Sequence, residues 1–381
     1  MQKDFKENNL KPYAVKSANT RGRLINEKEH NFRSPYQRDR DRIIHSSSFR
    51  RLKHKTQVFV NTEGDHYRTR LTHSMEVSQI ARTLARALGL NEDLCETLSL
   101  SHDLGHTPFG HAGEEILNTC MKEHGGFDHN IQTLRILTLL ENKYYKFLGL
   151  NLSIETLDGL IKHNGPVRNT NNFEKILKNN LFNKKINFNK FPSLEAQVAS
   201  ISDDIAYNNH DLEDGLRANL FTITKLQKIP FINKLITRHN KNIKLHRREI
   251  IINQIIRQLI NLMVEDVIKN TKKNLKKIKP KSINDIYDSN IYIVDFSSKI
   301  KKFDKKIKLF LKNNMYNNKH VLINTNKGKN IIKKLFYFIS NNPKKFIHKN
   351  LIKKYKKERA TADFISGMTD RYAINLYRKL K

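Results

Sequence analysis

The chain of 381 residues is long enough to bury a large core, as one large domain or two ordinary ones. Its low glycine (14) and proline (8) contents disfavour a turn-rich β architecture, and its two cysteines, Cys95 and Cys120, lack the spacing of a thiolate metal site. No apolar run reaches the roughly 18 residues of a membrane span, and the N-terminal residues form no apolar signal region. We therefore expect a cytoplasmic protein that does not contact membranes.

The formal net charge of +34 attracts polyanions such as nucleic acid, nucleotides or acidic lipid. Much of this charge comes from a Lys/Asn/Ile-rich composition that begins near residue 220, as in "KNTKKNLKKIKPKSIND". Such a composition is typical of an A+T-rich coding bias, in which case the lysines form an ordinary solvated surface. Salt-sensitive binding of single-stranded nucleic acid is the alternative interpretation.

Three zones follow one another along the chain. Residues 1–65 are expected to be irregular and arginine-rich, and residues 66–215 to form helices joined by short breaks. Residues 216–381 are basic and expected to be mostly helical, packed on the middle zone. No internal repeat and no Gly/Ser linker marks a clean domain boundary.

The first expected helix of the middle zone lies in "THSMEVSQIARTLARALGL", residues 72–90. Its apolar stripe consists of Val77, Ile80, Ala81, Leu84, Ala85 and Leu88. Gly89 is a plausible stop, and His73 lies in the first turn.

The next segment, "NEDLCETLSLSHDLGH", has Asn91 as its expected N-cap. His102 follows Leu98 by four residues and so lies on the same inward stripe, with Asp103 beside it. Unpaired buried polar groups are costly, so these side chains need partners. A hydrogen-bonded core histidine and a metal ligand are about equally good interpretations of this pair.

A further acidic group is expected from "LEAQVASISDDIAYNNHDLEDG", residues 194–215, where apolar residues and alanines predict a helix buried on two faces. Asp203 lies among the alanines, Tyr207 and Asp211 follow at i+4 and i+8, and Asp204 points nearer the flank. Two histidines and two aspartates would form a mixed nitrogen and oxygen site, which suits Mn, Fe, Zn or Mg.

A histidine, then "HD", then a downstream aspartate resembles the HD-domain metal-dependent phosphohydrolases. The strings "RDRIIHSSSFRRLKHKTQVF", "GDHYRTRLTHSMEV", "SHDLGHTPFGHAGE", "GGFDHNIQTLRIL", "LEAQVASISDDIAYNNHDLEDG" and "FISGMTDRYAINLY" narrow this to the deoxyguanosine triphosphate triphosphohydrolases and their bacterial relatives. The similarity covers most of residues 20–220 and about the last twenty. It implies an all-α fold with an HD catalytic core at 66–215, to whose active site residues 1–65 contribute. The implied reaction converts a dNTP and water into a deoxynucleoside and inorganic triphosphate.

By this resemblance the ligands of a divalent metal (Mn, Mg, Fe or Zn) are His73, His102, Asp103 and Asp203. Asp203 is preferred to Asp204 because Tyr207 and Asp211 then keep the spacing that the family shows for nucleotide contacts.

His111 and Glu114 match the family's catalytic pair, in which Glu114 would orient His111 to handle a proton. A favourable charge near a helix N-terminus is the alternative role for Glu114. His129 matches another active-site histidine, and His106 is expected to support the site or face the phosphates.

The expected substrate contacts are Arg51, Gln57, Arg70, Tyr207 and Asp211. Arg70 matches a phosphate-contacting arginine, and Gln57 a residue at the deoxyribose end. Lys55, Arg371 and Tyr372 are weaker candidates.

Two other functions remain open from the sequence: another HD-type nucleotide phosphohydrolase, and a nucleic-acid-binding regulatory protein with weak or lost activity. The absence of a "GYP" element argues against a cyclic-dinucleotide phosphohydrolase. A homo-oligomer is expected.

Overall fold

The computed structural model describes residues 7–57, 68–168, 185–238 and 246–380, and this part of the chain contains seventeen α-helices and no strand. The predicted all-α class is confirmed. The helices are α1 (Pro35–Ile44), α2 (Ser47–Arg51), α3 (Arg70–Leu88), α4 (Glu92–Ser101), α5 (Gly110–Cys120), α6 (His129–Arg135), α7 (Ile154–Ile161), α10 (Leu194–Arg217), α11 (Ile223–Leu226), α12 (Pro230–Arg238), α14 (Arg248–Ile278), α15 (Ile283–Tyr287), α16 (Ser298–Leu311), α17 (Lys319–Asn341), α18 (Lys349–Tyr355), α19 (Lys357–Ser366) and α20 (Asp370–Lys379). Short 3₁₀ or π segments occupy Ser17–Asn19, Leu52–His54, Lys122–His124, Ile136–Leu140, Lys312–Tyr316 and Pro343–Lys345.

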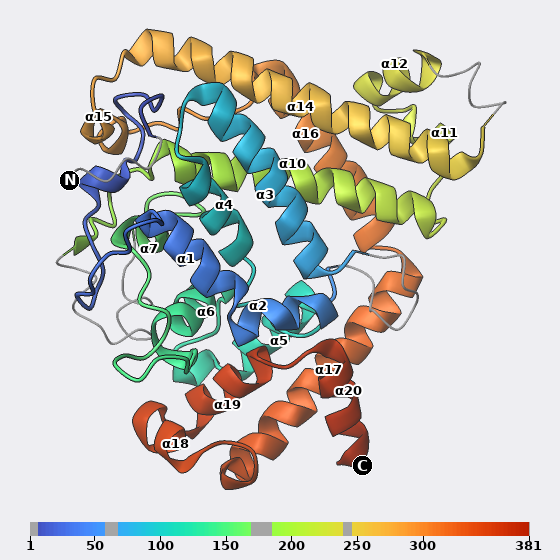
Figure 1. Ribbon diagram of the computed structural model, residues 1–381. Coiled ribbons are helices and arrows are strands. Elements are labelled where there is room, and N and C mark those ends of the chain that lie inside the picture. Colours follow the sequence, from blue (N-terminus) through green and yellow to red (C-terminus); the bar gives the residue numbers. More distant parts are fainter. Residues whose placement is uncertain (1–6, 58–67, 169–184, 239–245, 381) are drawn as a thin grey trace.

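Helix α10 is the centre of the fold, with α3, α4 and α14 packed on it (Figure 1). Its apolar stripe, including Val198 and Ile205, belongs to a core shared with α3, α14 and α16. Ala196 and Ala199, on the other side, belong to a second core shared with α4 and α7. The helix is therefore buried on two faces, as its sequence pattern predicts.

The ends of α3 and α4 are set by local chemistry. The side chain of Thr69 accepts a hydrogen bond from the third residue of α3, and Gly89 ends that helix with φ +69°, a conformation that favours glycine. The side chain of Asn91 then caps α4 by accepting from the amide of Leu94. The two helices consequently pack side by side and bring their polar ends toward α10.

The prediction that residues 1–65 are irregular is wrong for residues 35–51, which form α1 and α2. Ser34 and Gln37 make a reciprocal capping box, and Pro35 occupies the first turn of α1. Tyr36 and Ile43 are fully buried, and α1 packs on α4. The arginine run concealed this amphipathic pattern, because Arg38 and Arg40 are only partly exposed and paired with acids, and Arg42 is itself buried.

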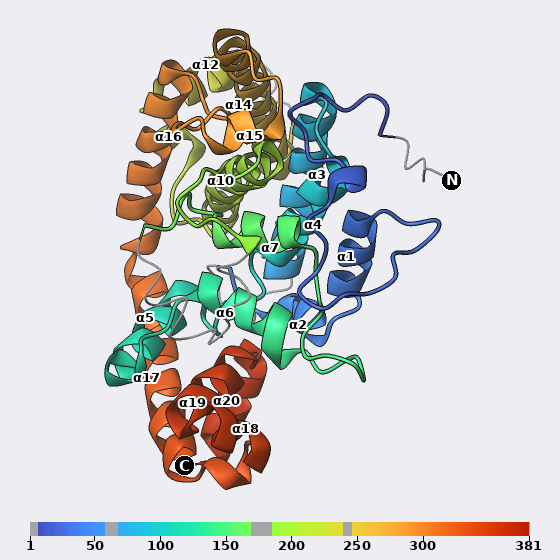
Figure 2. The same ribbon diagram turned by 90° about the vertical axis from the view of Figure 1, so that its left-hand side faces the viewer.

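The C-terminal helices pack against one side of the middle zone. Helices α16 and α17 follow each other along one side of the molecule, and α18, α19 and α20 gather at its lower end (Figure 2). A third core joins Leu117 of α5 with Ile332 of α17 and Ile365 of α19. The proposed boundaries between the three zones stay predictions. Within the described residues, no helix has the length and apolarity needed to cross a membrane.

Candidate metal centre and active site

Three of the four predicted metal ligands converge from three helices. His73 in the first turn of α3, His102 at the end of α4 and Asp203 in α10 each offer one ligand atom, and these atoms lie within 4.8 Å of one another. The Nε2 atom of His73 is 2.9 Å from Asp203 Oδ1, and Nε2 of His102 is 3.5 Å from the same oxygen. Two imidazole rings therefore direct their Nε2 atoms at one carboxylate oxygen.

The protonation of His102 shows that this cluster suits a cation. Its Nδ1 is 2.7 Å from the carbonyl oxygen of Ser99 and must donate there, so Nε2 carries a lone pair in the neutral ring. That nitrogen is buried and has no hydrogen-bond partner within the described structure. Burial lowers the pKa of His102, but the carboxylates of Asp103 and Asp203 outweigh it and raise the pKa to about 9. A divalent ion would satisfy the lone pair and both carboxylates without this extra proton.

Asp103, the fourth predicted ligand, lies beside this group but is turned partly away from it. Its Oδ2 accepts from Arg70 Nη1 at 2.9 Å, and its Oδ1 is 3.1 Å from His106 Nε2 and 3.4 Å from His102 Nε2. Burial raises the pKa of Asp103, but Arg70 and the two histidines hold it well below its usual range. The group stays ionised and available to a metal.

The alternative carboxylate, Asp204, points away from the cluster. Its Oδ1 accepts from Lys308 of α16 at 2.8 Å, and its side chain is 45% exposed. The helical register therefore turns Asp203 toward the two histidines and Asp204 toward α16.

Two further histidines reach this cluster, and the sequence patterns did not single them out. The ring of His163 stacks on that of His102, and its Nε2 is 3.5 Å from Asp203 Oδ2. His210 lies two turns after Asp203 in α10, with its Nδ1 3.1 Å from His73 Nδ1. The sequence signal that could have indicated His163 is its position two residues after the end of a buried apolar helix. The signal for His210 is its i+7 spacing from Asp203.

A second polar cluster contains the predicted proton-transfer residues. Glu114 in α5 accepts from the amide of His129 at 2.9 Å and from its ring Nδ1 at 2.7 Å, and it also lies 3.2 Å from His111 Nδ1. The His106 ring stacks on that of His129, with centroids 4.0 Å apart, and links this cluster to Asp103. Burial raises the pKa of Glu114, but bonds from His111 and His129 lower it far more. His111 is the exposed member.

The turn between α4 and α5 positions both clusters. A Cβ atom at Gly105 would lie 2.1 Å from the carbonyl oxygen of His129, so this close approach of two backbones requires glycine. Phe109 adopts φ +61°, and its amide donates to Asp370 of α20 at 3.0 Å. Its ring packs on Gly328 of α17, where a Cβ atom would lie 2.8 Å from it. The C-terminal helices thus hold the turn.

The predicted phosphate-binding cations differ in how accessible they are. Arg70 is buried and paired with Asp103, and the Nε atom of the partly buried Arg51 has no partner in the described structure. Lys55 is fully buried and donates to the carbonyl oxygens of His106 and Ser366, at 2.6 and 2.7 Å. Burial and the nearby arginines lower its pKa to about 7. Arg371 and Tyr372 are exposed on α20.

The predicted sugar contacts lie on the same side of α10 as Asp203. The Tyr207 ring is edge-on to that of His73, with centroids 6.3 Å apart, and the Tyr316 hydroxyl donates to Asp211. The other oxygen of Asp211 has no partner within the described residues, nor does the side-chain oxygen of Gln57. Burial raises the pKa of Asp211 to about 8. The oxygen of Gln57 is an acceptor, and the Asp211 carboxyl, protonated below this pKa, can donate to or accept from a substrate hydroxyl.

Comparisons with known proteins agree with this geometry. An HD domain matches residues 70–208, and a phosphohydrolase-associated domain matches residues 294–379. The chain is 60% identical over 357 residues to a deoxyguanosinetriphosphate triphosphohydrolase-like protein of Pelagibacter ubique, covering 94% of this chain and 96% of that protein. The chain belongs to the deoxyguanosinetriphosphate triphosphohydrolase-like family.

Other members of this family are similar over nearly the same length. The protein of Bartonella tribocorum is 48% identical, with 97% of this chain and 94% of that protein covered. The protein of Parvibaculum lavamentivorans is 45% identical, with 97% and 96% covered. The predicted family membership is confirmed, and the HD domain supports a phosphohydrolase whose His/Asp cluster could hold a divalent metal.

Proposed function

We propose that this protein hydrolyses deoxynucleoside triphosphates to the deoxynucleoside and inorganic triphosphate. The observation that carries the proposal is the buried Nε2 of His102, which has no hydrogen-bond partner in the described part of the chain and faces Asp203 near the His111–Glu114–His129 cluster. A cluster that could hold a metal lies near a candidate proton-transfer group, and this arrangement supports metal-assisted hydrolysis of a phosphate ester. The printed names of the relatives support dGTP as one substrate to test.

His73, His102, Asp103 and Asp203 would hold the divalent ion, in a mixed nitrogen and oxygen set that suits Mn, Fe, Zn or Mg. A bound ion supplies charge neutralisation at the α-phosphate and lowers the pKa of the attacking water. The chain itself supplies the orientation of the ligands. The Ser99 carbonyl fixes the ring of His102, and Arg70 holds the carboxylate of Asp103.

In the proposed reaction, a water oxygen bonds to the α-phosphorus, and the bond from that phosphorus to the 5′-oxygen breaks. The 5′-oxygen gains a proton and leaves as the hydroxyl of the deoxynucleoside, while the water oxygen stays on the triphosphate. His111 would handle one of these protons, and its exposed ring, in contact with Glu114, supports this role. Glu114 orients its ring and stabilises the imidazolium form.

The remaining predicted contacts would bind the two ends of the substrate. Arg51 and Arg70 are the candidate partners of the triphosphate, whose charge demands cations. Within the described residues the side-chain oxygen of Gln57 and one oxygen of Asp211 have no partner, so Gln57 would accept from a sugar hydroxyl, the Asp211 carboxyl would bond another, and Tyr207 would pack against the sugar. A tight fit around Gln57 would exclude a 2′-hydroxyl.

The experiment is an assay of purified protein with Mn²⁺ against each dNTP and NTP, with products separated by anion-exchange chromatography. The proposal expects inorganic triphosphate from dNTPs and little from NTPs. Release of monophosphate or pyrophosphate would show a different HD-type phosphohydrolase. No turnover of any nucleotide would favour a regulatory, nucleic-acid-binding protein. Cytoplasmic location and a homo-oligomeric state stay predictions.

A further inference from the structure

The second nitrogen of His73 meets an unusual partner. A metal-ligating histidine usually donates its other N–H to a carboxylate, a carbonyl oxygen or water, as His102 does to Ser99. In His73 that nitrogen, Nδ1, faces the Nδ1 of His210 at 3.1 Å. Both rings are almost completely buried. Two bare nitrogens would repel each other there, so one of the pair must carry the proton.

Glu76 decides which one carries it. Its Oε2 accepts from Arg68 Nε at 3.0 Å and lies in hydrogen-bond contact with His210 Nε2. A carboxylate oxygen only accepts, so Nε2 of His210 is the protonated nitrogen and Nδ1 of the neutral ring is bare. His73 must then donate from Nδ1, and its Nε2 lone pair faces Asp203 at 2.9 Å.

Gln57 is compatible with the same assignment. Its side-chain nitrogen is placed 3.5 Å from His73 Nδ1, while its side-chain oxygen has no partner in the described structure. The two ends of an amide are distinguished by their hydrogen bonds. As placed, this nitrogen would face the N–H of His73, so the assignment requires the amide to be turned over. Its oxygen has two lone pairs and can then accept from His73 as well as from a sugar hydroxyl.

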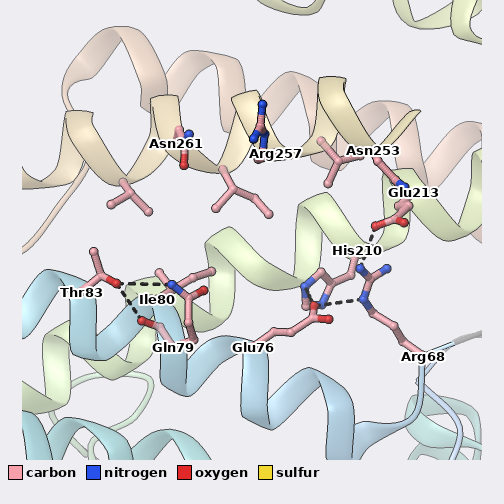
Figure 3. A pocket seen from close by; sticks show the side chains of 13 residues that line it. Arg68, Glu76, Gln79, Ile80, Thr83, His210, Glu213, Asn253, Arg257 and Asn261 are labelled. Carbon is pink, nitrogen blue, oxygen red and sulfur yellow. Dashed lines mark hydrogen bonds and ion pairs between the residues drawn. The ribbon is translucent and has the colours of Figure 1, made fainter. Parts of the chain in front are cut away.

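A cavity outside the metal centre gives solvent access to Glu76 and His210. It has a volume of about 480 Å³ and lies between α3, α10 and α14, with Glu76 and His210 in its wall (Figure 3). Figure 3 shows Arg68 reaching from Glu76 to Glu213 beside them. The side chain of Glu76 is 43% exposed, so this series of contacts begins at the solvent and ends at two buried histidine rings.

We propose that His210 and Glu76 are positioning residues that hold His73 in the tautomer and orientation its metal-ligating role needs. Helices α3 and α10 then each supply one ligand and one support: His73 with Glu76, and Asp203 with His210. The inference rests on the proposed metal-dependent function, and it adds two residues that never touch the ion or the substrate.

The test measures Mn²⁺ binding to the full chain by isothermal titration, without turnover. His210→Ala is expected to weaken Mn²⁺ binding by about 10–100-fold, the usual effect of losing such a support. Glu76→Ala, whose partly exposed side chain puts folding less at risk, should weaken it in the same direction and decides the question if His210→Ala does not fold. Gln79→Ala is the matched control, because Gln79 lines the same cavity on α3 and, among the described residues, its side chain bonds only Thr83.

Imidazole separates positioning from a merely structural role. His210→Ala removes a ring that lines the cavity, so imidazole added from solvent can occupy the vacated place. We expect it to restore Mn²⁺ affinity in His210→Ala and not to improve binding by the wild type at the same imidazole concentration. Wild-type affinity in both folded variants, or no recovery with imidazole, overturns the inference while the proposed function stands. A wild-type chain that binds no Mn²⁺ overturns both.

Discussion

Each histidine of the candidate metal centre has one ring nitrogen already engaged, and this decides what the other nitrogen offers. In His102 the engaged atom is Nδ1, held by Ser99, and in His73 it is Nδ1, held by His210. Both rings therefore present Nε2 toward Asp203. The site is prepared for a metal by partners that are not themselves ligands.

The two adjacent aspartates of α10 should behave very differently. Asp203→Asn replaces a partly buried carboxylate that faces three imidazoles, so we expect more than about 100-fold weaker Mn²⁺ binding and loss of metal-dependent turnover. Asp204→Asn removes only a surface ion pair with Lys308 and should change both by less than about threefold. Metal titration and activity assays on both variants check this ranking, and the reverse order would contradict the assigned register.

Asp211 is expected to lower the stability of the fold near neutral pH, although it contributes to the proposed substrate binding. Burial raises its pKa in the folded chain to about 8, above the ordinary value of 3.8, so folding takes up a proton between these values. Stability is then lost progressively as pH rises from about 4 to about 8. Asp211→Asn does not titrate, and its melting temperature should exceed that of the wild type by about 2 °C or more near neutral pH.

Thermal melts of both proteins from about pH 5 to about pH 8 check this sign. The difference should grow with pH while the variant loses dNTP turnover. A variant that is less stable than the wild type at pH 8 would show that the ionised carboxylate has a partner that stabilises it.

At the scale of helices, the sequence pattern predicted α3, α4 and α10 well because each is amphipathic and capped by its own residues. Thr69, Gly89 and Asn91 act within a few positions of where they stand in the chain. The contacts of Glu76 with His210 and of His163 with Asp203 join residues far apart in sequence, so no local pattern shows them. The same reason hid the role of Asp370, which meets the turn before α5 only in the folded chain.

Asp370 should couple the last helix to the active-site turn. Its buried carboxylate accepts from the amide of Thr56 at 2.9 Å and from the amide of Phe109 at 3.0 Å. Asp370→Ala leaves three buried donors unsatisfied, the two amides and the Thr56 hydroxyl, at about 1–3 kcal/mol each, and frees the turn that carries His106 and leads into α5. We expect a lower urea midpoint together with reduced turnover. Asn375→Ala, an exposed position on the same helix, is the control. Equal urea midpoints for both variants would contradict the coupling.

At the scale of the whole molecule, the lysine-rich segment and the candidate metal ligands lie in different parts of the chain. Lysines concentrate after residue 220, including exposed Lys272, Lys273, Lys276 and Lys277 on α14. The candidate metal ligands lie between residues 73 and 203. A net charge of +34 favours contact with nucleic-acid phosphates but does not require it for catalysis.

Replacing these four lysines with glutamate should therefore weaken binding of single-stranded DNA and leave dNTP turnover nearly unchanged. Filter binding should fall steeply between about 50 and about 200 mM salt for the wild type, with a smaller slope for the variant. His111→Ala should do the opposite, lowering turnover by about 10²–10⁴-fold while DNA binding persists. Parallel loss of both activities in both variants would show that the basic region belongs to the active unit.

The most direct test of the central claim is triphosphate release under metal control. Metal-free protein is supplied with Mn²⁺ and a dNTP, and inorganic triphosphate and deoxynucleoside are quantified for the wild type and for His102→Ala. We predict equal amounts of the two products from the wild type, none after chelation, and none from the folded variant at any Mn²⁺ concentration that saturates the wild type. Undiminished triphosphate release by chelated protein or by His102→Ala would contradict a metal centre at His73, His102, Asp103 and Asp203.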